Sequence, residues 1–184
     1  GQYFAGNFTF FICLSWMHPY LMSHYHLTRE RAAWFSMIVL LIGATAQWVA
    51  GFLVDRLYRS PLRAHSRRIP AMTGFFLSAA ALAAIRLTTS PEASVACFAI
   101  ATFGAEMTVS PSWAFCIDLG GKKSGTVSGA MNMIGNFGSF VSASLFPVMN
   151  RWTGDATAYF LVAAALNVLA GTAWLRMSAP RRTS

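Results

Sequence analysis

The sequence SGAMNMIGNFGSF, residues 128–140, carries two asparagines four residues apart in a stretch that has no charged side chain. This uncharged stretch extends from residue 124 to residue 150. A helix needs roughly 20 residues to cross a bilayer, so the stretch is long enough to span one. It therefore raises two questions: whether the protein lies in a membrane, and what two amides do there.

Apolar stretches of similar length occur along the whole chain. Of its 184 residues, 55% are hydrophobic and only 11% are charged, which is unusual for a soluble domain. A buried core helix could explain one apolar stretch, but six in series indicate an all-α membrane protein. We expect residues 1–184 to form one bundle of transmembrane helices at 3–23, 32–54, 69–88, 93–117, 124–150 and 156–176.

The net charge of +8 invites a nucleic-acid interpretation, which the location of the charges opposes. Only Arg29, Arg31, Arg86 and Arg151 fall on one side of the predicted bundle. The other side holds Arg56, Arg59, Arg63, Arg67, Arg68, Lys122, Lys123, Arg176, Arg181 and Arg182. By the positive-inside rule, both termini and the 55–68 and 118–123 loops lie in the cytoplasm. The short tail SAPRRTS is expected to be disordered.

Neither a metal site, a cofactor site nor an enzyme active site is indicated. Cys13, Cys97 and Cys116 fall inside predicted helices without paired spacing, and HYH at 24–26 has no third ligand at a suitable spacing. An intramembrane enzyme would need a nucleophile with a base, or a metal pair, at helical spacing. The chain opens on GQYFAGNF without an initiator Met or a basic leader segment, so we expect it to be part of a longer protein.

The fifth predicted helix is the richest in polar residues. Ser124, Ser128, Asn132 and Asn136 recur every four residues along one face, and Gly125, Gly129, Gly135 and Gly138 would let neighbouring backbones approach. The amides of Asn132 and Asn136 could hold the hydroxyl or carboxylate groups of a polar solute. They could equally join two helices by hydrogen bonds.

Other polar residues inside predicted helices are candidates for the same site, because unpartnered polar groups are costly in hydrocarbon. Glu106 is the only acid well inside a helix, with Ser110 on its face; it is a candidate proton carrier or hydrogen-bonding group. It could also cap a backbone carbonyl beside Pro111. Tyr3, Asn7 and Gln47 are expected to line a cavity, with helix association as the alternative for Gln47.

The end of the second predicted helix, GFLVDRLYRS at 51–60, suggests a gate. Gly51 would permit close helix contact, and Asp55 could accept from a neighbouring helix N-terminus or pair with an arginine in one conformation only. The alternative is a simple stop-transfer segment at the end of the helix. Such a segment would need arginines such as Arg56, but it would need neither Gly51 nor Asp55.

These residues resemble known motifs. Gly51, Asp55, Arg56 and Arg59 resemble the loop signature of the major facilitator superfamily, in the copy between its helices 8 and 9. SPSWAFCIDLGGKKSGTVSGAMNMIGNFGSF, at 110–140, resembles helices 10 and 11 of its anion:cation symporter family. WMHPYL and TGDATAYFLVAAALNVLAGTAWL are similar to the end of helix 7 and to helix 12. The sequence departs from the family pattern at His18, which stands at a usual proline position, at Ser139, and at Glu106, which is not an acid of that pattern.

The resemblance implies the C-terminal six-helix half of a transporter of small organic anions, such as sugar acids, driven by proton symport with alternating access. It also implies that the main coupling acids and a substrate-binding arginine belong to the missing N-terminal six-helix half. We expect Asn132, Asn136 and Ser128 to contact substrate, in the bilayer of a bacterial inner (plasma) membrane. A drug exporter and a non-transporting membrane interaction protein are the alternatives.

Overall fold

The computed structural model describes residues 1–177, and the predicted tail from residue 178 onward lies outside them. The described residues form helices joined by short turns. Their bounds are α1 Gln2–Phe11, the π-helical η1 Ile12–Trp16, α2 Met17–Tyr25, α3 Arg29–Tyr58, the 3₁₀ turn η2 Arg63–His65, α4 Arg68–Ile85, α5 Pro91–Met107, α6 Val109–Gly120, the 3₁₀ turn η3 Gly121–Lys123, α7 Ser124–Thr153 and α8 Thr157–Ala173.

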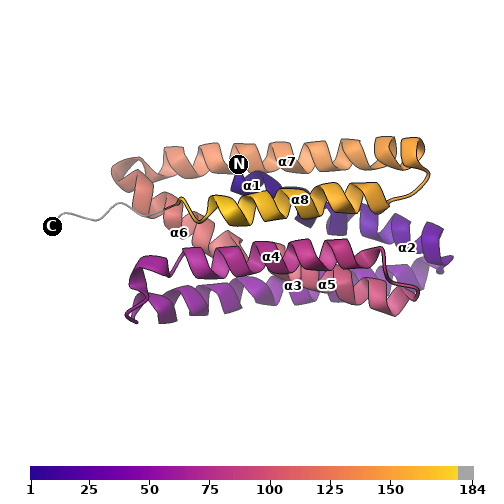
Figure 1. Cartoon of the computed structure of the whole chain (residues 1–184), viewed down its shortest axis with the longest axis horizontal. Helices are drawn as coiled ribbons and strands as arrows, with labels where there is room; N and C mark the ends of the chain where they lie inside the picture. The colour runs from indigo at the N-terminus through magenta and orange to yellow at the C-terminus, as the bar shows by residue number, and fades with distance from the viewer. Residues whose placement is uncertain (178–184) are drawn as a thin grey trace.

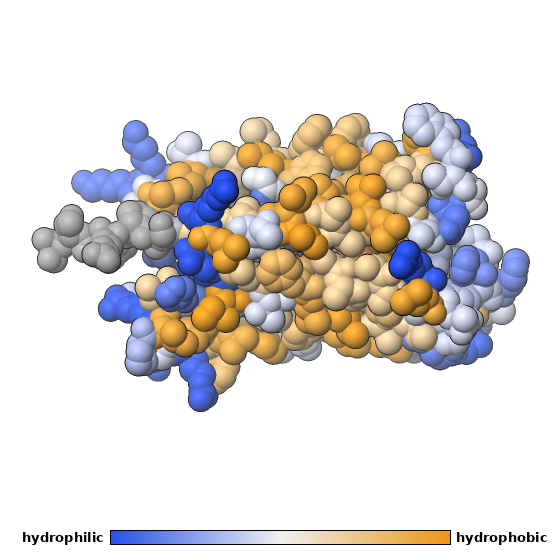
Figure 2. Space-filling model, in the orientation of Figure 1, coloured by the Kyte–Doolittle hydropathy of each residue, from blue (hydrophilic) through white to orange (hydrophobic). Residues whose placement is uncertain are grey.

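The helices lie side by side along one long axis (Figure 1). One end gathers the α3–α4 connection, the α6–α7 turn and the end of α8, which hold the predicted cytoplasmic charges. Figure 2 shows a broad apolar band between two hydrophilic ends. Gly1 lies partway along the long axis in Figure 1.

Three described helical stretches are long and apolar enough to cross a membrane: Arg29–Tyr58, Arg68–Ile85 and the stretch Pro91–Thr153, which contains α5, α6 and α7. The apolar helix α8 is shorter. Many large apolar side chains face outward, Trp48 at 81% and Phe52 at 64% exposure among them. Such a surface is costly in water and favourable in lipid. The predicted all-α membrane class is confirmed.

The first span is continuous from α1 to α2 but widens in its middle. Pro19 cannot donate a backbone hydrogen bond, and in a regular helix its ring would collide with the carbonyl of Ser15. The π-helical turn η1 lies just before Pro19, and the amide of Met17 there bonds to the carbonyl of Ile12, five residues back. The wider turn accommodates the proline without ending the helix.

The fourth span, predicted as one helix, is broken in the structure. α5 ends at Met107 and α6 begins at Val109, with Thr108 between them. Pro111 therefore falls in the first turn of α6, where a missing amide hydrogen costs nothing. The Thr108 hydroxyl donates to the carbonyl of Ala105 at 2.7 Å. The break places Glu106 and Ser110 on opposite sides of a joint between two helices.

Glycines set the closest helix contacts. A Cβ atom at Gly138 would lie 2.5 Å from the backbone oxygen of Phe4, so α7 and α1 touch backbone to backbone there. Gly74 of α4 and Gly104 of α5 make a similar contact. Gly125 and Gly129 have no neighbour within 4 Å of such a Cβ, so the predicted close packing is wrong for those two glycines within the described chain.

Buried hydrogen bonds, not foreseen from the sequence, join the helices. Asn167 of α8 donates to the hydroxyl of Thr9 of α1 at 2.6 Å, and both side chains are fully buried. Ser142 of α7 donates to the carbonyl of Phe8 at 2.8 Å and lies 2.7 Å from the hydroxyl of Tyr159. These hydrogen bonds fix α1, α7 and α8 together.

Candidate functional site

A small polar cavity lies where α1, α3, α5 and α6 meet. Its volume is about 230 Å³. Four of the predicted site residues line it, Tyr3, Asn7, Gln47 and Glu106. They come from three helices that are far apart in the sequence, and the fold alone brings them together. The other lining residues are Gly6, Phe10, Ala105, Thr108 and Val109.

The side chains of Glu106 and Gln47 form a hydrogen bond across the α3–α5 contact. Gln47 donates through Nε2 to Oε2 of Glu106 at 2.5 Å, and Glu106 is only 8% exposed. The helices can approach because Gly43 has no side chain: a Cβ there would lie 2.6 Å from Cγ2 of Thr102. Gln47 therefore both lines the cavity and joins two helices, and Glu106 bonds to an amide side chain rather than to a carbonyl beside Pro111.

Ser110 extends this contact to α6. Its hydroxyl donates to the backbone carbonyl of Gln47 at 3.2 Å. A serine after the break in the fourth span thus holds α6 against α3, and this half-buried residue is not among those that line the cavity. A movement of α6 would therefore shift the backbone of Gln47 through this hydrogen bond.

Tyr3 and Asn7 form the wall of the cavity on α1. Tyr3 accepts a hydrogen bond from the indole nitrogen of Trp113 at 3.0 Å, and their rings meet edge to face. Asn7 donates to the carbonyl of Tyr3 at 2.9 Å, which leaves the oxygen of its side-chain amide as an acceptor. The α1 wall therefore offers the cavity an oriented amide and a phenol.

The helix that carries the predicted amides, α7, packs against this wall at Gly135. A Cβ at Gly135 would lie 2.6 Å from the ring of Tyr3 and 2.7 Å from Nδ2 of Asn7. Asn132 and Asn136 are exposed, and Asn136 donates to the carbonyl of Asn132 at 3.1 Å within the helix. Neither amide bonds to another described helix, so the alternative that they join two helices of this part of the chain is wrong.

Ser128 does not share the exposed face of the two asparagines. It is buried, with 8% of its surface exposed. Positions four apart on a helix drift by about 40° per step, so Ser128 and the two asparagines do not point in one direction. The serine is thus separated from the amides that the sequence pattern groups with it.

The predicted gate residues lie at the charged end of α3. Asp55, Arg56 and Arg59 are all exposed, and Asp55 makes no ion pair among residues 1–177. Gly51 has no atom of another helix within 4 Å of a Cβ placed there, so the predicted close contact is not made within the described chain. The ion pair at this end is instead between Arg67 and Asp118, at 3.2 Å, which ties the start of α4 to the end of α6.

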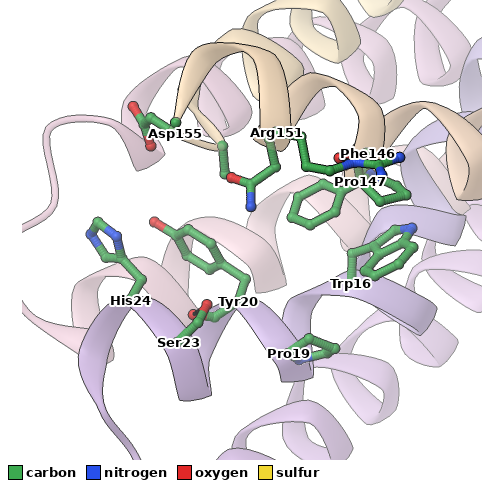
Figure 3. A pocket seen from close by; sticks show the side chains of 12 residues that line it. Trp16, Pro19, Tyr20, Ser23, His24, Phe146, Pro147, Arg151 and Asp155 are labelled. Carbon is green, nitrogen blue, oxygen red and sulfur yellow. Dashed lines mark hydrogen bonds between the residues drawn. The ribbon is translucent and has the colours of Figure 1, made fainter.

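A larger cavity of about 790 Å³ lies at the opposite end, between α2 and the α7–α8 turn. Figure 3 shows Trp16, Tyr20 and Phe146 along its walls, with His24 and Asp155 at one side. Trp16 and Phe146 stack at 4.7 Å, and His24 stacks on Tyr20 at 5.0 Å. None of the predicted site residues lines this cavity. The sequence gives no sign of it, because it forms only where the fold brings α2 next to the α7–α8 turn.

The smaller cavity therefore holds the candidate binding site. It presents amide donors and acceptors, a phenol and one carboxyl group, and none of its lining residues is a lysine or an arginine. Such groups orient hydroxyl and carboxyl groups of a solute, but they do not neutralise a negative charge. Asn132 and Asn136 are exposed on α7, the helix that packs against the α1 wall at Gly135.

An apolar helical bundle with a polar cavity between its helices defines a multispanning membrane protein. The sequence profile of the Major Facilitator Superfamily matches residues 2–143, and the chain belongs to that family. The superfamily predicted from the sequence is confirmed.

Curated relatives are named as transporters of anions. The chain is 28% identical to "Probable anion transporter 2, chloroplastic" of Oryza sativa subsp. japonica, a match that covers 88% of the chain and 30% of the relative. It is 26% identical to the hexuronate transporter of Bacillus subtilis (97% and 43% covered). It is 27% identical to the probable L-galactonate transporter of Escherichia coli (87% and 35% covered).

The chain thus spans less than half the length of these three relatives. Their names describe transporters rather than enzymes, and they agree with the anion:cation symporter resemblance drawn from the residues at 110–140.

Proposed function

We propose that this chain forms one half of a transporter of small organic anions, with sugar acids or related carboxylates as substrates. The observation that carries the proposal is the convergence of Tyr3, Asn7, Gln47 and Glu106 on one cavity, whose α1 wall packs against α7 at Gly135. Polyhydroxy acids offer many hydroxyl groups, which suit a site rich in amides. The named relatives of hexuronate and galactonate type support this substrate class.

The proposed mechanism is alternating access, in which the two six-helix halves rock around a shared midplane site, with proton symport as the driving reaction. Because the cavity of this half has no basic residue, the positive charge that binds a carboxylate would come from the other half. Asn132 and Asn136 lie on an open face of α7, where they can bind substrate between the halves.

The proposed gate is the charged end of α3. Asp55 and Arg56 are exposed and free to contact the other half in a state that is closed to the cytoplasm. The ion pair of Arg67 with Asp118 holds α4 and α6 together at the same end, so that this side of the half moves as one body. Making and breaking contacts of Asp55 would then separate two conformations.

The protein is an integral membrane protein by family and by its apolar helices. We place it in a bacterial inner membrane, with the 59–67 and 121–123 turns in the cytoplasm, because most basic residues gather at that end. The relative of Oryza sativa is named as chloroplastic.

The test uses the complete transporter in membrane vesicles, with radiolabelled glucuronate and galactonate as substrates and a lipophilic cation as comparison. Asn136→Ala should abolish or strongly weaken sugar-acid uptake and leave membrane insertion intact. Asn150→Ala, at the other end of the same helix, is the matched control and should transport normally. Wild-type uptake by Asn136→Ala would remove that amide from the site, and uptake of only the lipophilic cation by the unaltered protein would refute the substrate class.

A further inference from the structure

We propose that Glu106 is a proton-binding site of the transport cycle, located in this half of the protein; the proposal rests on the proton symport proposed above. Glu106 is the acidic residue enclosed within the described spans, at 8% exposure. No lysine, arginine or histidine nitrogen lies within 4 Å of it among residues 1–177. An enclosed carboxylate with one neutral donor is costly, and binding a proton removes its charge.

Gln47 is suited to both protonation states of this carboxyl group. In the charged state its Nε2 donates to Oε2 of Glu106, at the observed 2.5 Å. A neutral carboxylic acid needs an acceptor instead, and the side-chain oxygen of the same amide supplies one after the amide turns over. A lysine or arginine at this place would hold Glu106 in its charged form. Because glutamine can bond to both forms, Glu106 can bind a proton and release it again.

Among the groups around the cavity, Glu106 is the one whose charge changes when a proton binds. Tyr3 on α1 and Cys13 on η1 are the titratable side chains near it from the elements packed against α5. The neighbours contributed by α3 and α6 are Gln47 and Ser110, and within α5 Thr102 faces Gly43; none of these ionises near neutral pH. All charged residues of α3 lie towards its two ends. A proton bound near the cavity therefore has one carboxylate to occupy.

The proton site is connected to the helices that border the break in the fourth span. Glu106 lies at the end of α5, and Ser110 of α6 donates to the backbone carbonyl of Gln47, the partner of Glu106. When Glu106 gains a proton, its bond with Gln47 reverses direction, and α3, α5 and α6 respond through the same residues. In the cycle the proton passes from water outside to one carboxylate oxygen, and later from that oxygen to water in the cytoplasm. No other bond is made or broken.

The experiment compares Glu106→Gln with the unaltered complete transporter in proteoliposomes, using radiolabelled galactonate and glucuronate. One assay measures accumulation driven by a pH gradient, and the other measures exchange of labelled for unlabelled substrate at equal pH. Glutamine has the size of glutamate and can bond to Gln47, so the variant should fold. Glu92→Gln is the control, because Glu92 is an exposed acid at the outer end of α5, paired with Arg31.

The expected result is that Glu106→Gln reduces accumulation driven by the pH gradient far more than it reduces exchange, while Glu92→Gln keeps both. Retention of pH-driven accumulation by Glu106→Gln would overturn the proposal and leave the transporter assignment intact. An equal loss of exchange and of accumulation would overturn it too, because Glu106 would then act in substrate binding alone. If a sodium gradient instead of a pH gradient drives uptake by the unaltered protein, the proposed proton coupling fails, and the role of Glu106 fails with it.

Discussion

Two glycines of α7, Gly138 and Gly129, should respond in opposite ways to the same substitution. A Cβ at Gly138 would lie 2.5 Å from the backbone oxygen of Phe4 and 3.1 Å from its carbonyl carbon and Cα. These are main-chain atoms and cannot rotate away, so Gly138→Ala forces α1 and α7 apart at a cost of about 1–3 kcal/mol. A Cβ at Gly129 meets nothing within 4 Å, and alanine there favours the helix by about 0.5–1 kcal/mol.

The difference between the two variants is therefore about 1.5–4 kcal/mol, or a separation in Tm of about 3–16 °C for a chain of this size. The assay is thermal unfolding of the purified chain in detergent, followed by a fluorogenic thiol reagent. Cys13, Cys97 and Cys116 are free thiols, of which two are buried, so unfolding exposes them to the reagent. Equal Tm values for Gly138→Ala and Gly129→Ala would refute the steric account of the α1–α7 contact.

Two further substitutions test the proposed transport site and gate in the complete transporter. Tyr3→Phe removes the acceptor of the Trp113 indole hydrogen bond. It should raise the KM for galactonate about fivefold, which corresponds to the loss of one hydrogen bond of about 1 kcal/mol. An unchanged KM would show that this phenol does not orient the site. Asp55→Asn should change the turnover rate more than the affinity, because Asp55 lies outside the cavity at the end of α3, and an unaltered turnover rate would remove its gating role.

The all-α membrane class of the fold can be predicted from the sequence, because six long uncharged stretches are stable together only as helices in a bilayer. The break at Thr108 was not predicted. Pro111 marks a discontinuity, but a proline in the first turn of a new helix and a proline inside a kinked helix look alike in sequence. The glycines show a similar limit. Gly129 and Gly138 have the same local signature, and only the position of α1 separates them.

The candidate site was predictable as a set of residues but not as an arrangement. Tyr3, Asn7, Gln47 and Glu106 stand out because each is polar within an apolar helix. The partnership of Gln47 with Glu106 joins residues 59 positions apart, and no local pattern encodes a contact over that distance. The interhelical bond of Asn167 with Thr9 was missed for the same reason.

The hydrogen bonds of each polar group separate structural from functional positions in this bundle. Asn167 is fully buried and donates to two protein acceptors, so its amide stabilises the folded bundle. Asn136 is exposed, and its single bond is to a carbonyl of its own helix, which a solute can replace at little cost. Glu106 stands between these cases, because it is enclosed and holds one neutral partner. A group in that position is stable in either protonation state only if its partner can both donate and accept, and the amide of Gln47 meets that condition.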